Sequence, residues 1–493
     1  MNYVSTRGNG GCVSAAEAIK RGLAADGGLF MPERLPPLEG DELLSLIPLT
    51  YAERAARIMH KFLEDYTYEE LIFDTNAAYS EEKFGSHPAP ITKLDQNSFM
   101  LELWHGPTCA FKDMALQIMP RLFVRALKKT GEDKLALILV ATSGDTGKAA
   151  LEGYRDVPGT KIKVFYPENG VSRVQKLQMQ TQEGENVSVS AIVGNFDDAQ
   201  NGVKRIFSDR EFAKVLSDNS VFLSSANSIN WGRLLPQIVY YVSAYCDLVK
   251  SGDITLGEKI DVCVPTGNFG NIFAAYLAKM MGLPIEKLVC ASNVNNVLTN
   301  FLENGTYDRN RTFHTTMSPS MDILISSNLE RLLYLTAGPS GTAEYMESLA
   351  KTGKYTLTDE DFLKIKESFI GYYTSEEETM QTVLSTFKNK NCLVDTHTAV
   401  ALAATGKYMS DDKAERKILT VSTASAYKFA KDVYLSLTAK EPSGDIEALE
   451  ELLSLTGVAI PKPLEAVLNK EVRHIGIIEK EEMEKSVLDF AKS

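Results

Sequence analysis

Residues 135–140 form a continuous apolar run, Leu135-Ala136-Leu137-Ile138-Leu139-Val140. A strand that is apolar at every position is typical of a parallel sheet buried on both faces. A polar, glycine-containing loop follows at Thr142–Gly147, and a helical pattern begins at about Lys148. This order of strand, polar turn and helix predicts one unit of an α/β fold.

The same unit recurs twice farther along the chain. Val262-Cys263-Val264 is followed by a polar turn and a helical pattern over 271–281, and Ile418–Val421 by a polar turn and a helical pattern from about Tyr427. Shorter apolar strands are predicted at 162–166, 187–193, 221–223 and 288–291. The repetition predicts an α/β fold class, with parallel sheets covered by helices on both faces. Ligands of such sheets bind beyond the carboxyl ends of the strands, where these loops lie.

The two ends of the chain differ from this pattern. Ser14-Ala15-Ala16-Glu17 is a capping box for a helix that stops at Gly22, helical patterns fill roughly 40–85, and His87-Pro88-Ala89-Pro90 has the composition of a linker. The acidic C-terminal part has helical patterns at 446–455 and 480–491. We therefore expect three parts: a mainly helical N-terminal domain over 1–90, an α/β region of two interleaved subdomains over 91–440, and a helical covering segment over 441–493.

Composition narrows the class of protein. The chain has 493 residues, 44% of them hydrophobic and 24% charged, which is ordinary for a globular enzyme. Its net charge is −13 without any run of lysines or arginines, so nucleic acids and anionic membranes are poor partner candidates. The six cysteines form no C-x-x-C pair, which disfavours a zinc site or a disulfide framework. With no signal-peptide pattern and no membrane-spanning run, we expect a cytoplasmic protein.

The stretch from Trp104 to Met114 contains a candidate catalytic lysine, Lys112. Gly106-Pro107 favours a turn, Thr108 is a good helix N-cap, and apolar residues recur at helical spacing from Phe111 onward. Lys112 is thus expected in the first turn of a half-buried helix, where the helix dipole disfavours positive charge. A neutral lysine amine is suited to covalent chemistry with an aldehyde. Taken alone, the position also fits a surface lysine.

Three further loops have side chains suited to binding anions. Gly267-Asn268-Phe269-Gly270-Asn271 lies between a strand and a helix and predicts a phosphate cradle, although Pro265 excludes the G-x-G-x-x-G dinucleotide motif. The loop from Thr142 to Lys148 departs from the nucleotide-binding P-loop and fits a carboxylate better. The stretch Ser224–Arg233 supplies hydroxyls, amides and one guanidinium. Each loop alone also fits an ordinary connection or a helix cap.

The histidines show no metal-ligand spacing. Asp395-Thr396-His397 fits either a ligand cluster or, more simply, a capped helix start. No metal site is predicted.

The ordered set of motifs resembles threonine synthase of the longer bacterial and fungal type. Further matching stretches are Tyr3–Gly8, Gly22–Leu29, Ser318–Ile323 and Ser327–Arg331, so the resemblance runs from residue 3 to about residue 429. The four main motifs are H-G-P-T-x-A-F-K-D at 105–113, T-S-G-D-T-G at 142–147, S-A-N-S-I-N-W-x-R at 225–233 and G-N-F-G-N at 267–271.

The resemblance implies a pyridoxal-phosphate-dependent enzyme with the fold of the tryptophan synthase β chain (fold type II). Such an enzyme converts O-phospho-L-homoserine and water to L-threonine and phosphate, by γ-elimination followed by addition of water at the β carbon. Lys112 would form the Schiff base with the cofactor aldehyde and, once freed, act as general base. Thr423 would face the pyridine nitrogen, and Ser425-Ala426-Tyr427 stands where many relatives have H-P-A. The implied cofactor-binding residues are Phe111, Lys112, Gly267, Asn268, Phe269, Gly270, Asn271 and Thr423.

The resemblance also suggests how the substrate is bound. Its carboxylate would meet hydroxyls of the 142–146 loop, and its phosphate needs cationic or multiple N–H donors. The candidate substrate-binding residues are Thr142, Ser143, Asp145, Thr146, Lys148, Arg173, Asn227, Ser228, Asn230 and Arg233.

Two alternatives stay open from the sequence. A serine or threonine dehydratase of the same fold usually has consecutive glycines at the cofactor phosphate, unlike residues 267–271. A non-catalytic threonine-synthase-like binding protein would not need Lys112 and the loops intact. The sequence leaves the oligomeric state open.

Overall fold

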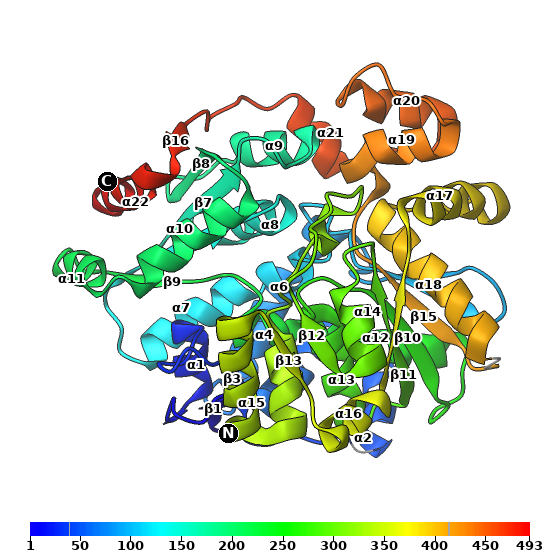
Figure 1. The fold of residues 1–493 in the computed structure, drawn as a ribbon, viewed down its shortest axis with the longest axis horizontal. Coiled ribbons are helices and arrows are strands. Elements are labelled where there is room, and N and C mark those ends of the chain that lie inside the picture. The colour runs from blue at the N-terminus through cyan, green and yellow to red at the C-terminus, as the bar shows by residue number, and fades with distance from the viewer. Residues whose placement is uncertain (39, 413–414) are drawn as a thin grey trace.

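A computed structural model describes residues 1–38, 40–412 and 415–493 (Figure 1). Its larger sheet has six strands, all parallel to their neighbours except the antiparallel edge strand β4. The strands are, in order across the sheet, β14 (Phe369–Tyr373), β11 (Ile285–Ser292), β10 (Ile260–Pro265), β15 (Ile418–Ser422), β5 (Ser98–Glu102) and β4 (Ile91–Lys93).

The second sheet has five strands, all parallel. In order they are β16 (Ile477–Glu479), β8 (Val187–Val193), β7 (Thr160–Pro167), β6 (Leu135–Ala141) and β9 (Val221–Ser224). All seven apolar runs lie in one of these two sheets, so the predicted parallel α/β architecture is confirmed.

Helices cover both faces of each sheet, as alternate residues of the strands indicate. In β10, Val262 and Val264 face the main core with α13 (Gly270–Met280), whereas Cys263 packs with Val400 and Ala401 of α18 (Thr396–Asp412). The second sheet is covered by α8 (Asp145–Tyr154) on one face and by α10 (Phe196–Ser208) and α22 (Met483–Lys492) on the other. Burial on both faces explains the uninterrupted apolar runs.

The N-terminal part combines helices with a small antiparallel sheet that the sequence did not predict. Ser14 caps the first helix by accepting a hydrogen bond from the Glu17 N–H, and the helix ends at Gly22 as expected. Side chains of this part share one continuous core with the α/β region. The elements are β1 (Tyr3–Ser5), β2 (Cys12–Val13), α1 (Ala15–Arg21), β3 (Phe30–Pro32), α2 (Gly40–Leu46), α3 (Tyr51–Phe62), α4 (Tyr68–Ala78) and α5 (Glu81–Phe84).

The C-terminal segment is not purely helical. It runs along the upper edge of the view in orange and red, from α20 (Glu447–Thr456) past α21 (Lys462–Leu468) to β16 and α22 (Figure 1). β16 pairs in parallel with β8, from Ile477 opposite Ala191 to Glu479 opposite Val193. The segment therefore extends the second sheet as well as covering it.

The remaining elements connect or cover the sheets. Among the described residues, no helix is both long and apolar enough to cross a membrane. These elements are α6 (Asp113–Leu116), α7 (Met119–Lys129), α9 (Arg173–Gln180), α11 (Arg210–Asp218), α12 (Trp231–Ser251), α14 (Val297–Asn304), β12 (Thr306–Asp308), η1 (Pro319–Met321), α15 (Leu329–Thr352), β13 (Lys354–Thr356), α16 (Asp359–Lys366), α17 (Glu376–Lys390), η2 (Ala426–Phe429), α19 (Ala430–Thr438) and η3 (Lys480–Glu482).

Trp231 joins the N-terminal part to α12 and offers a test of the shared core. Its ring is fully buried and packs against Tyr3 and Phe62, with ring centroids 5.5 and 5.7 Å away. Trp231→Ala should lower the free energy of unfolding by about 3–5 kcal/mol, because it removes a large buried ring and leaves a cavity. Urea unfolding of the full chain measures this. Phe73→Ala, which truncates a side chain that is 65% exposed, should change the free energy of unfolding by less than about 0.5 kcal/mol.

Candidate active site

The segment before Lys112 is tied to the carboxyl end of β15. Ala110 and Ala424 form an isolated antiparallel bridge, the Phe111 N–H donates to the Thr423 carbonyl at 2.8 Å, and the Ser425 N–H donates to the Cys109 carbonyl at 3.1 Å. Cys109 adopts a left-handed conformation with φ 57°, which turns the chain toward this contact. The pairing brings Lys112 to the strand end, where ligands of parallel sheets bind.

The helix that follows is shorter than the sequence predicts. Lys112 is itself the N-cap residue of α6, which ends at Leu116, and α7 begins separately at Met119. Pro120 lacks the N–H that would continue one helix through this point. Thr108 does not cap the helix by the usual route; its N–H and its hydroxyl both donate to the Asp113 carboxylate at 2.7 Å.

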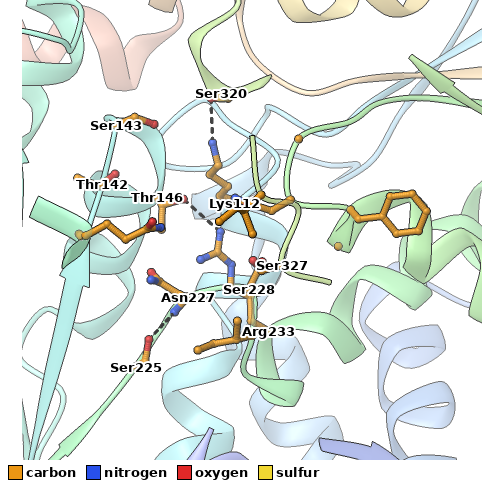
Figure 2. Close-up of a pocket in the computed structure, with 18 of the residues that line it drawn as sticks. Lys112, Thr142, Ser143, Thr146, Ser225, Asn227, Ser228, Arg233, Ser320 and Ser327 are labelled. Carbon is orange, nitrogen blue, oxygen red and sulfur yellow. Dashed lines mark hydrogen bonds between the residues drawn. The ribbon is translucent and has the colours of Figure 1, made fainter. Parts of the chain in front are cut away.

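The Lys112 amine is buried and has two polar neighbours. Its Nζ donates to Ser320 Oγ at 3.3 Å (Figure 2) and to Asp145 Oδ2 at 3.2 Å. The residue is only 9% exposed. Burial lowers the pKa of this amine from its ordinary value, even though the Asp145 carboxylate acts in the opposite direction. The Lys112 amine therefore loses its proton more readily than the amine of a solvent-exposed lysine.

The loop 267–271 lies between β10 and α13. Phe269 has a left-handed backbone, with φ 62°, and no side chain in the described part of the chain caps α13. The first N–H groups of a helix lack intrahelical acceptors, so they stay available to an anion. A Cβ on Gly267 would lie 2.6 Å from the Ser320 carbonyl oxygen, which explains why glycine is needed here.

Asn271 supplies a further donor to this loop. The hydroxyls of Tyr240 and Tyr241 both donate to Asn271 Oδ1, at 2.5 and 2.6 Å. Its Nδ2 is buried and has no hydrogen-bond partner among the described residues. An unpartnered buried donor is costly unless a ligand accepts from it. The loop therefore fits the phosphate group of a cofactor.

The opposite wall is built from the start of α8 and the loop before α12. Thr142 Oγ1 accepts from the N–H groups of Gly144 and Gly147, at 3.0 and 2.9 Å, and so shapes the turn. Ser143 and Thr146 lie on the same side of the cavity, and Asn227 and Ser228 lie below them in the view (Figure 2).

Arg233 is a buried cation without a carboxylate partner among the described residues. It is 5% exposed, and its guanidinium donates to the Ala226 carbonyl at 2.8 Å and to Thr146 Oγ1 at 3.3 Å. Burial lowers the pKa of Arg233 to about 10, which leaves the side chain charged at neutral pH. A buried unpaired charge is unfavourable without a counter-ion, so this side chain indicates a site for an anionic ligand.

These groups line one cavity of about 580 Å³, which also reaches α1 and α10. The structure thus brings together all four main motifs, which are far apart in the sequence. The predicted residues that line the cavity are Phe111, Lys112, Thr142, Ser143, Thr146, Asn227, Ser228, Arg233, Gly267, Asn268, Phe269, Gly270, Asn271 and Thr423.

Four predicted substrate residues do not line it. Asp145 accepts a hydrogen bond from the Lys112 amine outside the cavity lining, and Lys148 forms an ion pair with Glu152 at 3.1 Å. Asn230 caps α12 through the Gly232 N–H at 2.9 Å, and Arg173 is exposed at the start of α9. Direct substrate contacts by Lys148, Asn230 and Arg173 are therefore not supported by their positions.

Sequence reasoning did not assign a role to Ser320 or His397, which both line the cavity. His397 Nε2 accepts the Ser320 N–H at 3.1 Å, and its Nδ1 lies 2.7 Å from Asp395 Oδ2. Asp395 also accepts from the Thr398 N–H at 3.1 Å, so the 395–397 stretch is the capped helix start that was the simpler interpretation. The described residues contain no cluster suited to a metal ion.

Comparison with known proteins identifies the family. A family model described as "Pyridoxal-phosphate dependent enzyme" matches residues 85–424, and one described as "Threonine synthase N terminus" matches residues 2–79. Threonine synthase of Pseudomonas aeruginosa is 38% identical over 439 residues, covering 88% of this chain and 90% of that protein. The chain belongs to the threonine synthase family.

Solved threonine synthases share the whole fold. The pyridoxal-phosphate-bound enzyme from Brucella melitensis is 34% identical with a TM-score of 0.87, covering 100% of both chains. The yeast enzyme is 33% identical with a TM-score of 0.88, covering 99% of this chain and 98% of that one. The predicted family, its N-terminal domain and pyridoxal phosphate as the family's cofactor are confirmed.

A human relative is longer than this chain. Threonine synthase-like 1 of Homo sapiens is 42% identical over 471 residues, which cover 92% of this chain but 62% of the relative. This chain therefore matches only part of that protein, whose name does not establish the activity here.

The cradle at 267–271 gives a direct test of cofactor binding. Gly267→Ala should weaken pyridoxal phosphate binding about tenfold or more, because the added Cβ overlaps the Ser320 carbonyl. Absorbance titration of the full chain with the cofactor measures the affinity. Gly406→Ala, whose added Cβ meets nothing within 4 Å, should leave the affinity unchanged. Equal affinity for the Gly267→Ala variant would contradict the assignment of this loop.

Proposed function

We propose that this chain is a threonine synthase, which converts O-phospho-L-homoserine and water to L-threonine and phosphate. The observation that carries the proposal is the buried guanidinium of Arg233, which has no carboxylate partner among the described residues and lies in the same cavity as the Lys112 amine and the 267–271 cradle. The cavity can hold two anionic groups, one at the cradle and one at Arg233. A phosphorylated amino acid bound beside a phosphorylated cofactor meets that requirement.

The chain would hold pyridoxal phosphate at its two ends. Lys112 would bind the aldehyde end, and the N–H groups of 267–271 together with Asn271 Nδ2 would bind the phosphate. When bound, pyridoxal phosphate supplies an electron-accepting ring that makes the α proton of an amino acid easier to remove. Thr423 would meet the ring nitrogen with a hydroxyl, which supports its protonation less strongly than a carboxylate would.

Lys112 is the residue best suited to move protons at the substrate. Its Nζ lies in the cavity and has a lowered pKa, chiefly because it is buried. Once displaced from the cofactor, this amine would take the proton from the substrate α carbon and later return one there. Asp145 and Ser320 contact the Nζ and restrict where it points.

The two anionic groups of the substrate would occupy different walls. The α-carboxylate fits the start of α8, where Ser143 and Thr146 offer hydroxyls beside a helix N-terminus. The phosphate fits Arg233 with Asn227 and Ser228, since a charged guanidinium with amide and hydroxyl neighbours suits a phosphate better than neutral donors alone.

Replacement of Lys112 tests the proposed chemistry. The native chain with pyridoxal phosphate should release phosphate from O-phospho-L-homoserine and form threonine, whereas Lys112→Ala should lose at least about a thousandfold of this rate, since both the covalent anchor and the base are removed. The variant should also lose the borohydride-trappable cofactor. Formation of 2-oxobutyrate from threonine without phosphate release would favour a dehydratase. Cofactor capture with neither reaction would favour a binding protein.

Replacement of Arg233 tests the substrate phosphate site. Arg233→Gln should raise KM for O-phospho-L-homoserine about tenfold or more, because a charged hydrogen-bond donor is lost, while cofactor affinity changes little. Steady-state kinetics with phosphate detection measures the change. Arg173→Gln removes an exposed arginine that does not line the cavity and serves as the matched control. An unchanged KM in Arg233→Gln would place the phosphate elsewhere.

A further inference from the structure

Behind the cavity lies a second buried lysine, Lys428, which the proposed reaction does not use. It belongs to η2 and has no exposed side-chain surface. Its Nζ lies 2.8 Å from Asp145 Oδ1 and donates to the Thr108 carbonyl at 2.9 Å. Asp145 therefore lies between two lysine amines, with Lys112 on its other oxygen at 3.2 Å.

The two lysines compete unequally for this one carboxylate. Lys428 has the shorter ion pair and a carbonyl acceptor, whereas the second acceptor of Lys112 is the Ser320 hydroxyl at 3.3 Å. The positive charge of Arg233 also disfavours protonation of the Lys112 amine. Two cations and one anion buried together leave an excess positive charge, and losing one proton relieves it.

Asp145 stays ionised in this arrangement. Burial alone would raise the pKa of its carboxyl, but the Lys112 and Lys428 charges outweigh burial and hold the pKa well below its ordinary value. Gln175 Nε2 also donates to Oδ1 at 2.8 Å. If Lys112 becomes neutral, Lys428 still supplies a counter-charge to this carboxylate.

The other ionisable groups nearby do not change this balance. Asp113 lies beyond Thr108 and accepts both Thr108 donors at 2.7 Å, while burial raises its pKa to about 6. Burial also raises the pKa of the Cys109 thiol to about 12, which keeps it neutral. Lys148 is paired with Glu152.

We propose that Lys428 is a positioning residue that acts as the permanent counter-ion of Asp145, so that Lys112 is the amine of the pair that gives up its proton. This role rests on the proposed function of Lys112 as the residue that holds the cofactor. It adds a specific task for a buried lysine that does not line the cavity.

The test is the pH dependence of covalent cofactor capture by the full chain. Cofactor-stripped protein is mixed with pyridoxal phosphate from about pH 6 to about pH 10 and trapped with borohydride, with Lys112→Ala as background. Lys428→Met should move the midpoint of the capture rate to higher pH by about one unit or more, since Lys112 then holds Asp145 alone. Asp145→Asn should move it to lower pH, because Lys112 then faces Lys428 and Arg233 without an anion. Lys428→Arg should keep the native midpoint.

Opposite shifts in the first two variants separate this role from general damage to the fold. An unchanged or lower midpoint in Lys428→Met overturns the proposal. If that variant does not fold, Asp145→Asn decides, and an unchanged or higher midpoint there overturns it. Gln175→Leu removes a neutral hydrogen-bond donor to the same Asp145 carboxylate. If this variant shifted the midpoint as far as Lys428→Met does, the charge of Lys428 would not be the cause, and the proposal would be overturned. Because no amino-acid substrate is involved, loss of threonine formation leaves this result unaffected, whereas absence of capture by the native chain contradicts the role of Lys112 itself.

Discussion

The antiparallel contact between residues 109–111 and 423–425 is the interaction on which the site depends. Two main-chain hydrogen bonds, which together form the Ala110–Ala424 bridge, join these segments, which lie more than three hundred positions apart in the chain. They bring Lys112 and Thr423 to one cavity and Lys428 to its rear. Because the links are main-chain hydrogen bonds, Ser425-Ala426-Tyr427 can differ from H-P-A without opening the turn. Ser425 supports it by accepting from the Tyr427 N–H at 3.3 Å.

The parallel sheets could be predicted from the sequence because strands buried on both faces are apolar at every position. β6 follows this rule at every position. β7, β8 and β10 follow it less strictly, because each is mainly apolar but contains polar residues such as Lys163, Ser190 and Asp261. β16 does not follow it: it is a three-residue edge strand whose first residue is exposed, and its pairing with β8 comes from tertiary contact. The small N-terminal sheet is equally short and was missed for the same reason. A single helix was predicted from Phe111 onward because the apolar spacing continues without interruption. The structure has two helices there, with a break before Pro120.

The site could be predicted where a backbone feature has a local signature, as at 267–271. It could not be predicted where a side chain's partner comes from a distant segment. Lys148 and Arg233 are both cationic residues near a strand end, and only the fold distinguishes them: Lys148 meets Glu152, whereas Arg233 meets no carboxylate among the described residues. His397 was recognisable as part of a helix start, but its contact with Ser320 required the fold.

A chain with a net charge of −13 must attract an anionic substrate through a local concentration of positive charge. The cavity supplies it through Arg233 and the start of α13. Several helices have capping boxes that satisfy their first N–H groups, among them α3, α4 and α9. Among the described residues no side chain caps α13, because its N-cap residue is Phe269, whose ring has no acceptor; the Asn271 oxygen in its first turn is occupied by two tyrosine hydroxyls. The protein thus leaves unsatisfied the N–H groups that face the cavity, and an anion there completes hydrogen bonds that elsewhere are made within the chain.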